Sequence, residues 1–206
     1  METGTEAGIH KYVKAQIDLL AKDDRTLDQS GSKAQLAQLR RGVGKSPGEL
    51  PELWGMFLKN MPEELMGKDG RPSYAEWAAY TALTLFALHQ QGHSDPMNEE
   101  GEENRLGRAM QTLAHSEKED EENIRQKLSI AARSDDMAEL SYHLKTLVRL
   151  LGNHDIRLDY ADLAKDLYWF QFENHRDRIR LKWGQDFYRF AETKDNGKEE
   201  KCESIT

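Results

Sequence analysis

The stretch Ser73–Gln91 reads SYAEWAAYTALTLFALHQQ, and it decides the fold that the sequence predicts. Its first four residues have the form of a capping box, in which a serine and a glutamate three positions later satisfy each other's backbone N–H groups at a helix start. The residues that follow are apolar on nearly every side of a helix. Because such a helix is normally the buried centre of its domain, we expect a central helix over Tyr74–Gln91.

Other segments around this helix also have helical patterns. Met137, Leu140, Leu144, Leu147 and Leu151 repeat at alternating spacings of three and four, which predicts an amphipathic helix over Asp135–Leu151. Asp159 is suited to the N-cap of the next helix. We predict about nine helices and no strand, hence an all-α fold. The remaining predicted helices span about 9–20, 33–41, 47–61 (opened by a capping box at Ser46–Glu49), 105–114, 117–132 and 174–192.

The chain divides at an acidic segment with Pro96 and Gly101, the residue types that interrupt helices. We expect two small helical bundles in an elongated arrangement. The predicted parts are an N-terminal helical domain over 8–94, an acidic linker over 95–103, a C-terminal bundle over 104–193 and a disordered tail over 194–206.

Composition restricts the compartment and the class of protein. The chain has 206 residues, and Cys202 is its single cysteine, so no intrachain disulfide can form. The N-terminus lacks the basic start and apolar run of a signal peptide. The most apolar stretch, 77–88, is shorter than the ~20 residues that span a bilayer. We therefore expect a cytoplasmic protein with no membrane contact.

Three short motifs could indicate a nucleotide or metal site, and each has a structural alternative that we prefer. Residues 42–46, GVGKS, resemble the end of a P-loop, but Leu39 stands where that motif needs glycine, and a helix stop explains the glycines. His89 and His93 lack a third ligand and are expected to be a solvated pair. The three acidic residues Asp159, Asp162 and Asp166 are better explained by helix capping than by a two-metal site. We expect no catalytic residue, no metal and no cofactor.

Basic residues gather in several places although the net charge is −8. Between Gly31 and Gly48 there are four basic residues and no acidic one, and the last helix carries a basic edge along its apolar face. Arginine suits phosphate because its planar fork donates two parallel hydrogen bonds. Composition alone leaves nucleic-acid binding and an ordinary solvated surface equally open.

Several segments resemble the CasB family in the family's order. They are AQLRRG at 37–42, ELPELW at 49–54, RLGRAM at 105–110, RSDDM at 133–137, LDY at 158–160 and WGQDFY at 183–188. The resemblance covers roughly Ile9 to Ala191. Each motif is short, and it is their order and spacing together that carry the resemblance.

CasB is the small subunit of the type I-E CRISPR Cascade complex, and the resemblance implies its properties. It implies two all-α domains, two copies along the backbone subunits, contact with the large subunit and the crRNA, and R-loop stabilisation through the target and displaced DNA strands. It implies no catalytic site, because cleavage belongs to a separately recruited nuclease-helicase. The nucleic-acid-binding residues predicted from the resemblance and the charge pattern are Arg40, Arg41, Arg108, Arg125, Arg133, Arg149, Arg176, Arg180 and Lys182.

Two other functions remain open from the sequence. One is a helical adaptor that binds only protein and uses the leucine seam of 137–151. The other is a metal-dependent phosphodiesterase built on the Asp159 cluster. The aromatic residues Trp54, Tyr168 and Trp169 could stack on exposed bases, but we expect them in the core.

Overall fold

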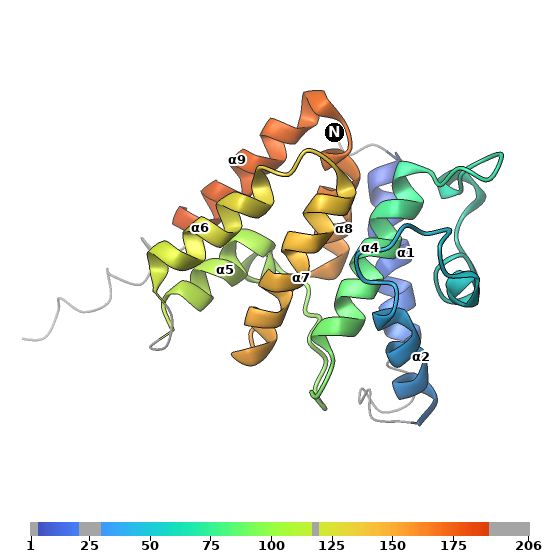
Figure 1. Ribbon diagram of the computed structural model, residues 1–206, viewed down its shortest axis with the longest axis horizontal. Helices are drawn as coiled ribbons and strands as arrows, with labels where there is room; N and C mark the ends of the chain where they lie inside the picture. The colour runs from blue at the N-terminus through green and yellow to red at the C-terminus, as the bar shows by residue number, and fades with distance from the viewer. Residues whose placement is uncertain (1–3, 21–29, 117–119, 190–206) are drawn as a thin grey trace, which may run out of the picture.

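The computed structural model describes residues 4–20, 30–116 and 120–189, and in these ranges the chain is all-helical (Figure 1). The described residues form no strand, and their one β-type pairing is an isolated bridge between Asn98 and Leu158. The α-helices are α1 (Gly4–Leu20), α2 (Ser30–Arg40), α3 (Trp54–Phe57), α4 (Tyr74–His89), α5 (Leu106–Ala114), α6 (Glu121–Ala132), α7 (Met137–Asn153), α8 (Tyr160–Phe170) and α9 (Glu173–Arg189). Short 3₁₀ turns lie at Pro51–Leu53, Glu63–Leu65 and Glu102–Asn104. The predicted fold class is confirmed.

Helix α4 is the buried helix that the sequence predicts. Its capping box is complete, because the Glu76 backbone N–H donates to Ser73 Oγ at 2.9 Å and the Ser73 N–H donates to Glu76 Oε2 at 2.7 Å. The helix packs against α1, α2, α7 and α8. Since it is covered from several directions, it can be apolar all round at no cost in exposed surface.

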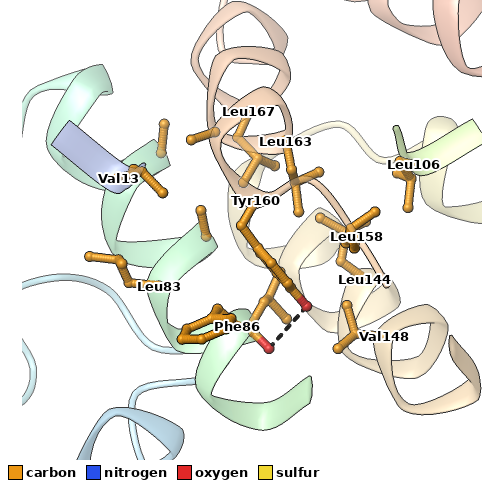
Figure 2. Close-up of a cluster of buried hydrophobic side chains, with 14 of the residues drawn as sticks. Val13, Leu83, Phe86, Leu106, Leu144, Val148, Leu158, Tyr160, Leu163 and Leu167 are labelled. Atoms are coloured by element: carbon orange, nitrogen blue, oxygen red, sulfur yellow. Dashed lines mark hydrogen bonds between the residues drawn. The ribbon is translucent and has the colours of Figure 1, made fainter. Parts of the chain in front are cut away.

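The buried side chains form one continuous cluster that extends from α1 to α9 (Figure 2). Tyr160 at the start of α8 inserts between the two halves of the chain, where its hydroxyl donates to the Leu85 carbonyl oxygen at 3.4 Å. Its ring meets that of Phe86 edge to face, with centroids 5.5 Å apart. Helix α8 thus packs on α1 and α4 as well as on α9. The predicted division at 95–103 concerns folding units, and it stays a prediction. The parts of the chain before and after it pack against each other at Tyr160.

The leucine seam of α7 lies inside the fold. Met137, Leu140, Leu144, Leu147 and Leu151 are all buried. The helix begins at Met137, with Asp136 as its N-cap, whose carboxylate accepts the Glu139 backbone N–H at 2.9 Å. Because the seam is covered by the chain's own core, a protein-only adaptor cannot use it for a partner helix.

The predicted helix start at Ser46 is wrong. Ser46–Glu49 is a turn: the Glu49 carboxylate accepts the Ser46 N–H at 2.7 Å as predicted, but Leu50 is extended and helical structure begins only at Pro51. Helix α6 begins at Glu121, and residues 117–119 of the range predicted for it lie outside the described residues. The predicted tail 194–206 lies outside the described residues, and no described helix is long and apolar enough to cross a membrane.

Candidate nucleic-acid interface

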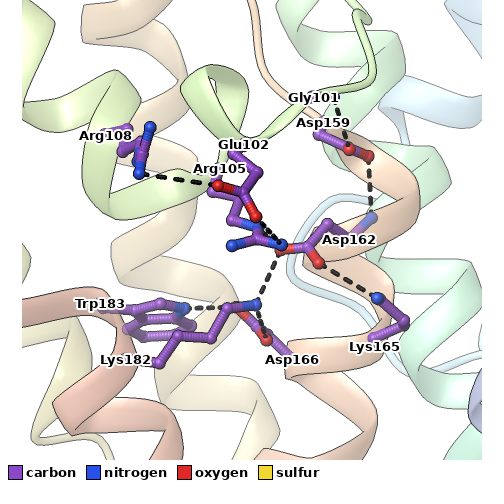
Figure 3. A network of polar contacts seen from close by, with 10 residues as sticks. All are labelled: Gly101, Glu102, Arg105, Arg108, Asp159, Asp162, Lys165, Asp166, Lys182 and Trp183. Atoms are coloured by element: carbon purple, nitrogen blue, oxygen red, sulfur yellow. Dashed lines mark hydrogen bonds and ion pairs between the residues drawn. The ribbon is translucent and has the colours of Figure 1, made fainter. Parts of the chain in front are cut away.

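Lys182 on α9 lies over a pair of buried aspartates on α8 (Figure 3). Its ammonium donates to Asp162 Oδ2 at 2.8 Å and to Asp166 Oδ1 at 2.6 Å. The second oxygen of Asp166 accepts the indole N–H of Trp183 at 2.7 Å. Lys165 also faces Asp162, with 3.3 Å between Nζ and Oδ1. Lys182 therefore neutralises charge inside the fold and joins α9 to α8.

The pKa values in this network follow from burial and from the lysine. Burial raises the pKa of Asp166 to about 6, although Lys182 acts in the opposite direction. Burial also opposes ionisation of Asp162, but Lys182, Lys165 and Arg105 together outweigh it and lower the pKa of that carboxyl. The pKa of Lys182 itself is raised, because its two carboxylate partners outweigh its own burial.

Asp159 has the capping role that the sequence predicts. Its Oδ1 accepts the Asp162 backbone N–H at 2.8 Å, and its Oδ2 accepts the Gly101 N–H at 3.2 Å. Its hydrogen-bond partners are therefore backbone groups, whereas Asp162 and Asp166 each meet a lysine and Asp166 also accepts the Trp183 indole N–H. Among the described residues, no group of three His, Cys, Asp or Glu side chains is arranged to hold a metal ion.

Arg176 and Arg180, one turn apart on α9, hold the C-terminal ends of neighbouring helices. Arg180 donates from Nε to the Ala132 carbonyl oxygen at 2.6 Å and from Nη2 to that of Ser134 at 3.2 Å. Arg176 donates from Nε to the Phe170 carbonyl oxygen at 3.2 Å and its guanidinium lies 5.2 Å from the Phe170 ring centroid. Carbonyl groups at helix ends have no partner within their own helix, so these arginines act as caps for α6 and α8.

Arg108 and Arg125 are paired with acidic side chains nearby. Arg108 lies mostly buried, with 3.8 Å between its Nη2 and Glu102 Oε2. It follows Gly107, where an added Cβ would lie 2.3 Å from the Trp183 carbonyl oxygen, so α5 and α9 cross in close contact there. Arg125 donates to both carboxylate oxygens of Glu122 on the exposed side of α6.

The end of α2 presents Arg40 and Arg41 at a glycine turn. An added Cβ on Gly42 would lie 2.4 Å from the Tyr80 hydroxyl, and that hydroxyl donates to the Gly42 carbonyl oxygen at 3.2 Å. The glycine is therefore needed for the turn to pack on α4. Because a helix and not a strand leads into residues 42–46, the structure excludes the P-loop interpretation.

Neither arginine at this turn is buried. Arg41 is 62% exposed and faces Glu52, with 3.1 Å between Nη2 and Oε1. Arg40 borders a hollow of about 580 Å³ between α2 and the end of α4, which Gln91 and His93 also line. Within the described ranges, no carboxylate pairs with Arg40.

Arg133 and Arg149 are also exposed. The side chain of Arg133 at the end of α6 donates from Nε to the Ser129 carbonyl oxygen of its own helix at 3.3 Å. Arg149 lies on the outer face of α7, one turn from Lys145, and no described carboxylate pairs with it. The same face carries Tyr142, which is 66% exposed and which our sequence reasoning missed. The sequence position of Tyr142 between the seam leucines could have indicated its exposure, because helix residues that do not belong to the buried seam point outward.

Two expectations about single residues are wrong. His89 is not solvated: it is 2% exposed, and the Tyr160 hydroxyl lies 2.9 Å from its Nδ1. Burial, with repulsion from His93 added, lowers its pKa to about 3. Trp54, which we expect in the core, is 50% exposed, whereas Tyr168 and Trp169 pack against the core from its edge.

These observations define a class of protein: an all-helical fold in which some arginines and lysines hold the helices together and others face solvent unneutralised. The comparison with protein families then identifies the chain. Residues 35–188 match the family described as CRISPR-associated protein Cse2. The chain belongs to this family, whose members include proteins named CasB.

Solved structures agree with this assignment. The crystal structure of CasB from Thermobifida fusca is 31% identical and has a TM-score of 0.72, with 88% of this chain and 98% of that chain covered. CasB from M. ruber is 21% identical, with a TM-score of 0.64 over 90% of this chain and 97% of that one. A chain of a CRISPR RNA-guided surveillance complex is 20% identical and shows the same fold, with a TM-score of 0.69. The match covers 95% of this chain and 99% of that one. A comparison with curated proteins finds no match.

Proposed function

We propose that the chain is the non-catalytic small subunit of a type I-E Cascade surveillance complex in the cytoplasm. Its partners there would be the backbone and large subunits, a second copy of itself, the crRNA and the two DNA strands. The observation that carries this proposal is the family match over residues 35–188. The fold likeness to a chain of an RNA-guided surveillance complex, which extends over 99% of that chain, supports it.

The proposed role of the subunit is to stabilise the R-loop through phosphate contacts. The heteroduplex formed is about as stable as the DNA duplex it replaces, so modest protein contacts suffice to shift the balance. Those contacts need no sequence preference, because the guide supplies specificity by base pairing. Exposed arginines that are not neutralised within the fold have the chemistry for this role.

We place the phosphate contacts on the exposed cations and not on α9. Arg40, Arg41 and Arg149 are accessible, and Arg41 can exchange its exposed partner Glu52 for phosphate at little cost, because surface ion pairs contribute roughly 0–1 kcal/mol. By contrast, Lys182, Arg180, Arg176 and Arg108 are engaged inside the molecule. Phosphate binding by these four, and by Arg125 and Arg133, stays a prediction.

The test is a salt series with the purified full-length protein on single-stranded and duplex DNA of several sequences. Each phosphate contact contributes roughly −0.7 on single strands and roughly −0.9 on duplex to the slope of log K against log salt. We expect binding that does not depend on the DNA sequence. The salt slope of the Arg40→Ala/Arg41→Ala variant should be shallower than that of the wild type by about two of these per-contact contributions. The matched control is Arg71→Ala/Arg178→Ala, two exposed arginines outside the proposed set.

The outcomes separate the proposal from its rivals. Equal slopes in the two double variants would show that the Arg40–Arg41 turn is not a phosphate site. If the wild-type protein binds no DNA either alone or within an assembled complex, the protein-only adaptor would be favoured. That adaptor would need a surface other than the buried leucine seam. Cleavage of DNA that depends on Mg²⁺ or Mn²⁺ and disappears in Asp162→Ala would instead support the phosphodiesterase.

A further inference from the structure

A groove of about 310 Å³ lies between α6 and α9, which both pack on α5. Leu128 and Ala132 of α6 and Trp183 and Phe187 of α9 line it with apolar surface. Arg125 and Arg133 border it from α6, and Tyr188 borders it from α9. Figure 1 labels these three helices on one side of the molecule, away from α1, α2 and α4. The groove is therefore apolar inside and basic along one edge.

Helix α9 presents an apolar stripe beside this groove. Leu181 is 61% exposed and Tyr188 is 56% exposed, and Gly184 lies between them. Residues three, four and seven positions apart share one face of a helix, so these three form a continuous surface. Large exposed apolar side chains that adjoin an apolar groove mark a site where another molecule binds.

Gly184 has no explanation within the described part of the chain. An added Cβ would meet nothing within 4 Å, and its φ is not in the left-handed region. Gly107 on α5 differs, because a Cβ there would collide with the backbone of α9. Glycine weakens a helix interior relative to alanine. A molecule that approaches the backbone of α9 closely at Gly184 would account for its lack of a side chain.

The two arginines on the rim indicate the charge of that molecule. Arg125 and Arg133 are eight residues apart on one helix, which corresponds to roughly 12 Å along its axis. Arg125 is held by Glu122, whose side chain is 67% exposed, and among the described residues the Arg133 side chain bonds to its own helix. Both can therefore turn to new carboxylates at small cost. Two acidic side chains about two helical turns apart would match them.

We propose that this groove docks an acidic amphipathic helix of another protein subunit, with an apolar side chain seated over Gly184. An amphipathic helix can lay its apolar face into a groove between two neighbouring helices. The apolar lining favours protein over nucleic acid, because Leu128, Ala132 and Phe187 offer no donor or acceptor to a base edge. This inference rests on the proposed function, since the partner is sought within the Cascade assembly.

The first experiment measures association of the full-length protein with a Cascade subcomplex that contains the other protein subunits and crRNA. We expect Gly184→Leu to bind at least tenfold more weakly, because the new side chain fills the groove. Its melting temperature should not fall, because the space is open and leucine is a better helix former. The matched control is Gly31→Leu on α2, where an added Cβ is equally free of contacts.

The results distinguish failure of the inference from failure of the proposed function. No association of the wild-type protein would overturn the proposed function and with it this inference. Equal association of wild type and Gly184→Leu would overturn the inference alone. Charge reversal adds a second arm: Arg125→Glu/Arg133→Glu should weaken association, whereas Arg178→Glu, outside the groove, should leave it unchanged.

A photo-crosslinking amino acid at position 181 identifies the occupant in the assembled complex. A crosslink to an acidic helix of another subunit supports the proposal. A crosslink to DNA or RNA, to a second copy of this chain, to residues 190–206 of the same chain, or to no molecule overturns it.

Discussion

The basic residues of α9 and those at the end of α2 and on α7 look alike in the sequence but act differently in the structure. Lys182 and Arg180 donate to buried aspartates and to the carbonyl groups of a neighbouring helix end. Arg149 is exposed and Arg40 is half-buried, and no described carboxylate pairs with either. The difference teaches that a cation can serve phosphate only when the tertiary structure leaves it unneutralised. The predictions below test this contrast, from the largest expected effect to the smallest.

Removal of the Lys182 ammonium is expected to have the largest effect on stability. Lys182→Ala leaves Asp162 and Asp166 without their cation, and loss of one partner from a buried pair costs about 3–5 kcal/mol. Urea denaturation of the variant and the wild type measures this difference. Unchanged stability together with weaker DNA binding would reverse our assignment of Lys182 to the fold.

Stability is also expected to depend on pH through His89, a buried group outside α9. His89 must stay neutral in the fold, where its pKa is about 3 against an ordinary value of 6.5. Its stabilising contribution is complete above pH 6.5 and is lost as the pH falls toward 3. At about 1.4 kcal/mol per unit below 6.5, acidification from pH 7 to pH 5 costs about 2 kcal/mol.

The His89→Gln variant isolates this effect by urea denaturation at both pH values. It should lose about 2 kcal/mol less than the wild type between pH 7 and pH 5. The comparison is needed because Asp166 acts in the opposite direction: its pKa is raised to about 6, so its contribution increases as the pH falls through that value. The same pH dependence in both proteins would contradict the burial of a neutral His89.

Arg180→Ala should have an intermediate effect. The carbonyl groups of Ala132 and Ser134 lose a charged donor, and hydrogen bonds to charged groups contribute about 1.5–3 kcal/mol. We expect about 1.5 kcal/mol, because the arginine is partly exposed. Arg178→Ala on the same helix is the control and should change stability by less than about 0.5 kcal/mol. Thermal unfolding of both variants distinguishes a helix cap from a phosphate contact.

Arg149→Ala should leave stability nearly unchanged, within about 0.5 kcal/mol, because its side chain is exposed on α7. Its expected effect is on binding: one phosphate contact fewer makes the salt slope on single-stranded DNA shallower by about 0.7. Arg180→Ala, compared at a temperature where both variants are folded, should leave that slope unchanged. A shallower slope for Arg180→Ala and an unchanged slope for Arg149→Ala would contradict the contrast between α9 and α7.

Much of the fold was predictable because local rules and the tertiary structure agree. The capping box at Ser73, the N-cap at Asp159 and the seam of α7 all lie where their patterns predict. The Ser46 capping box failed because its reciprocal bond also closes an isolated turn, and Leu50 then takes an extended conformation before Pro51. A cap motif thus predicts a helix only when the residues after it can continue one.

The candidate site was less predictable because side-chain partners come from distant parts of the chain. Lys182 meets residues on α8 that are 16 and 20 positions away, and Arg180 meets carbonyl groups 46 and 48 positions away. Helical periodicity places these cations on α9 but says nothing of the helix opposite. For the same reason Trp54 is exposed and His89 is buried, against expectation.

By itself, the sequence determined the all-helical class, the central apolar helix α4 and the family, because these depend on local propensity, periodicity and the order of motifs. Only the tertiary structure decided which cations are available to a ligand. Hydrogen bonds and ion pairs act over a few ångströms in space, and packing of α8 and α9 brings Asp162, Asp166 and Lys182 within that range, whereas nothing described in the chain approaches Arg149 in this way.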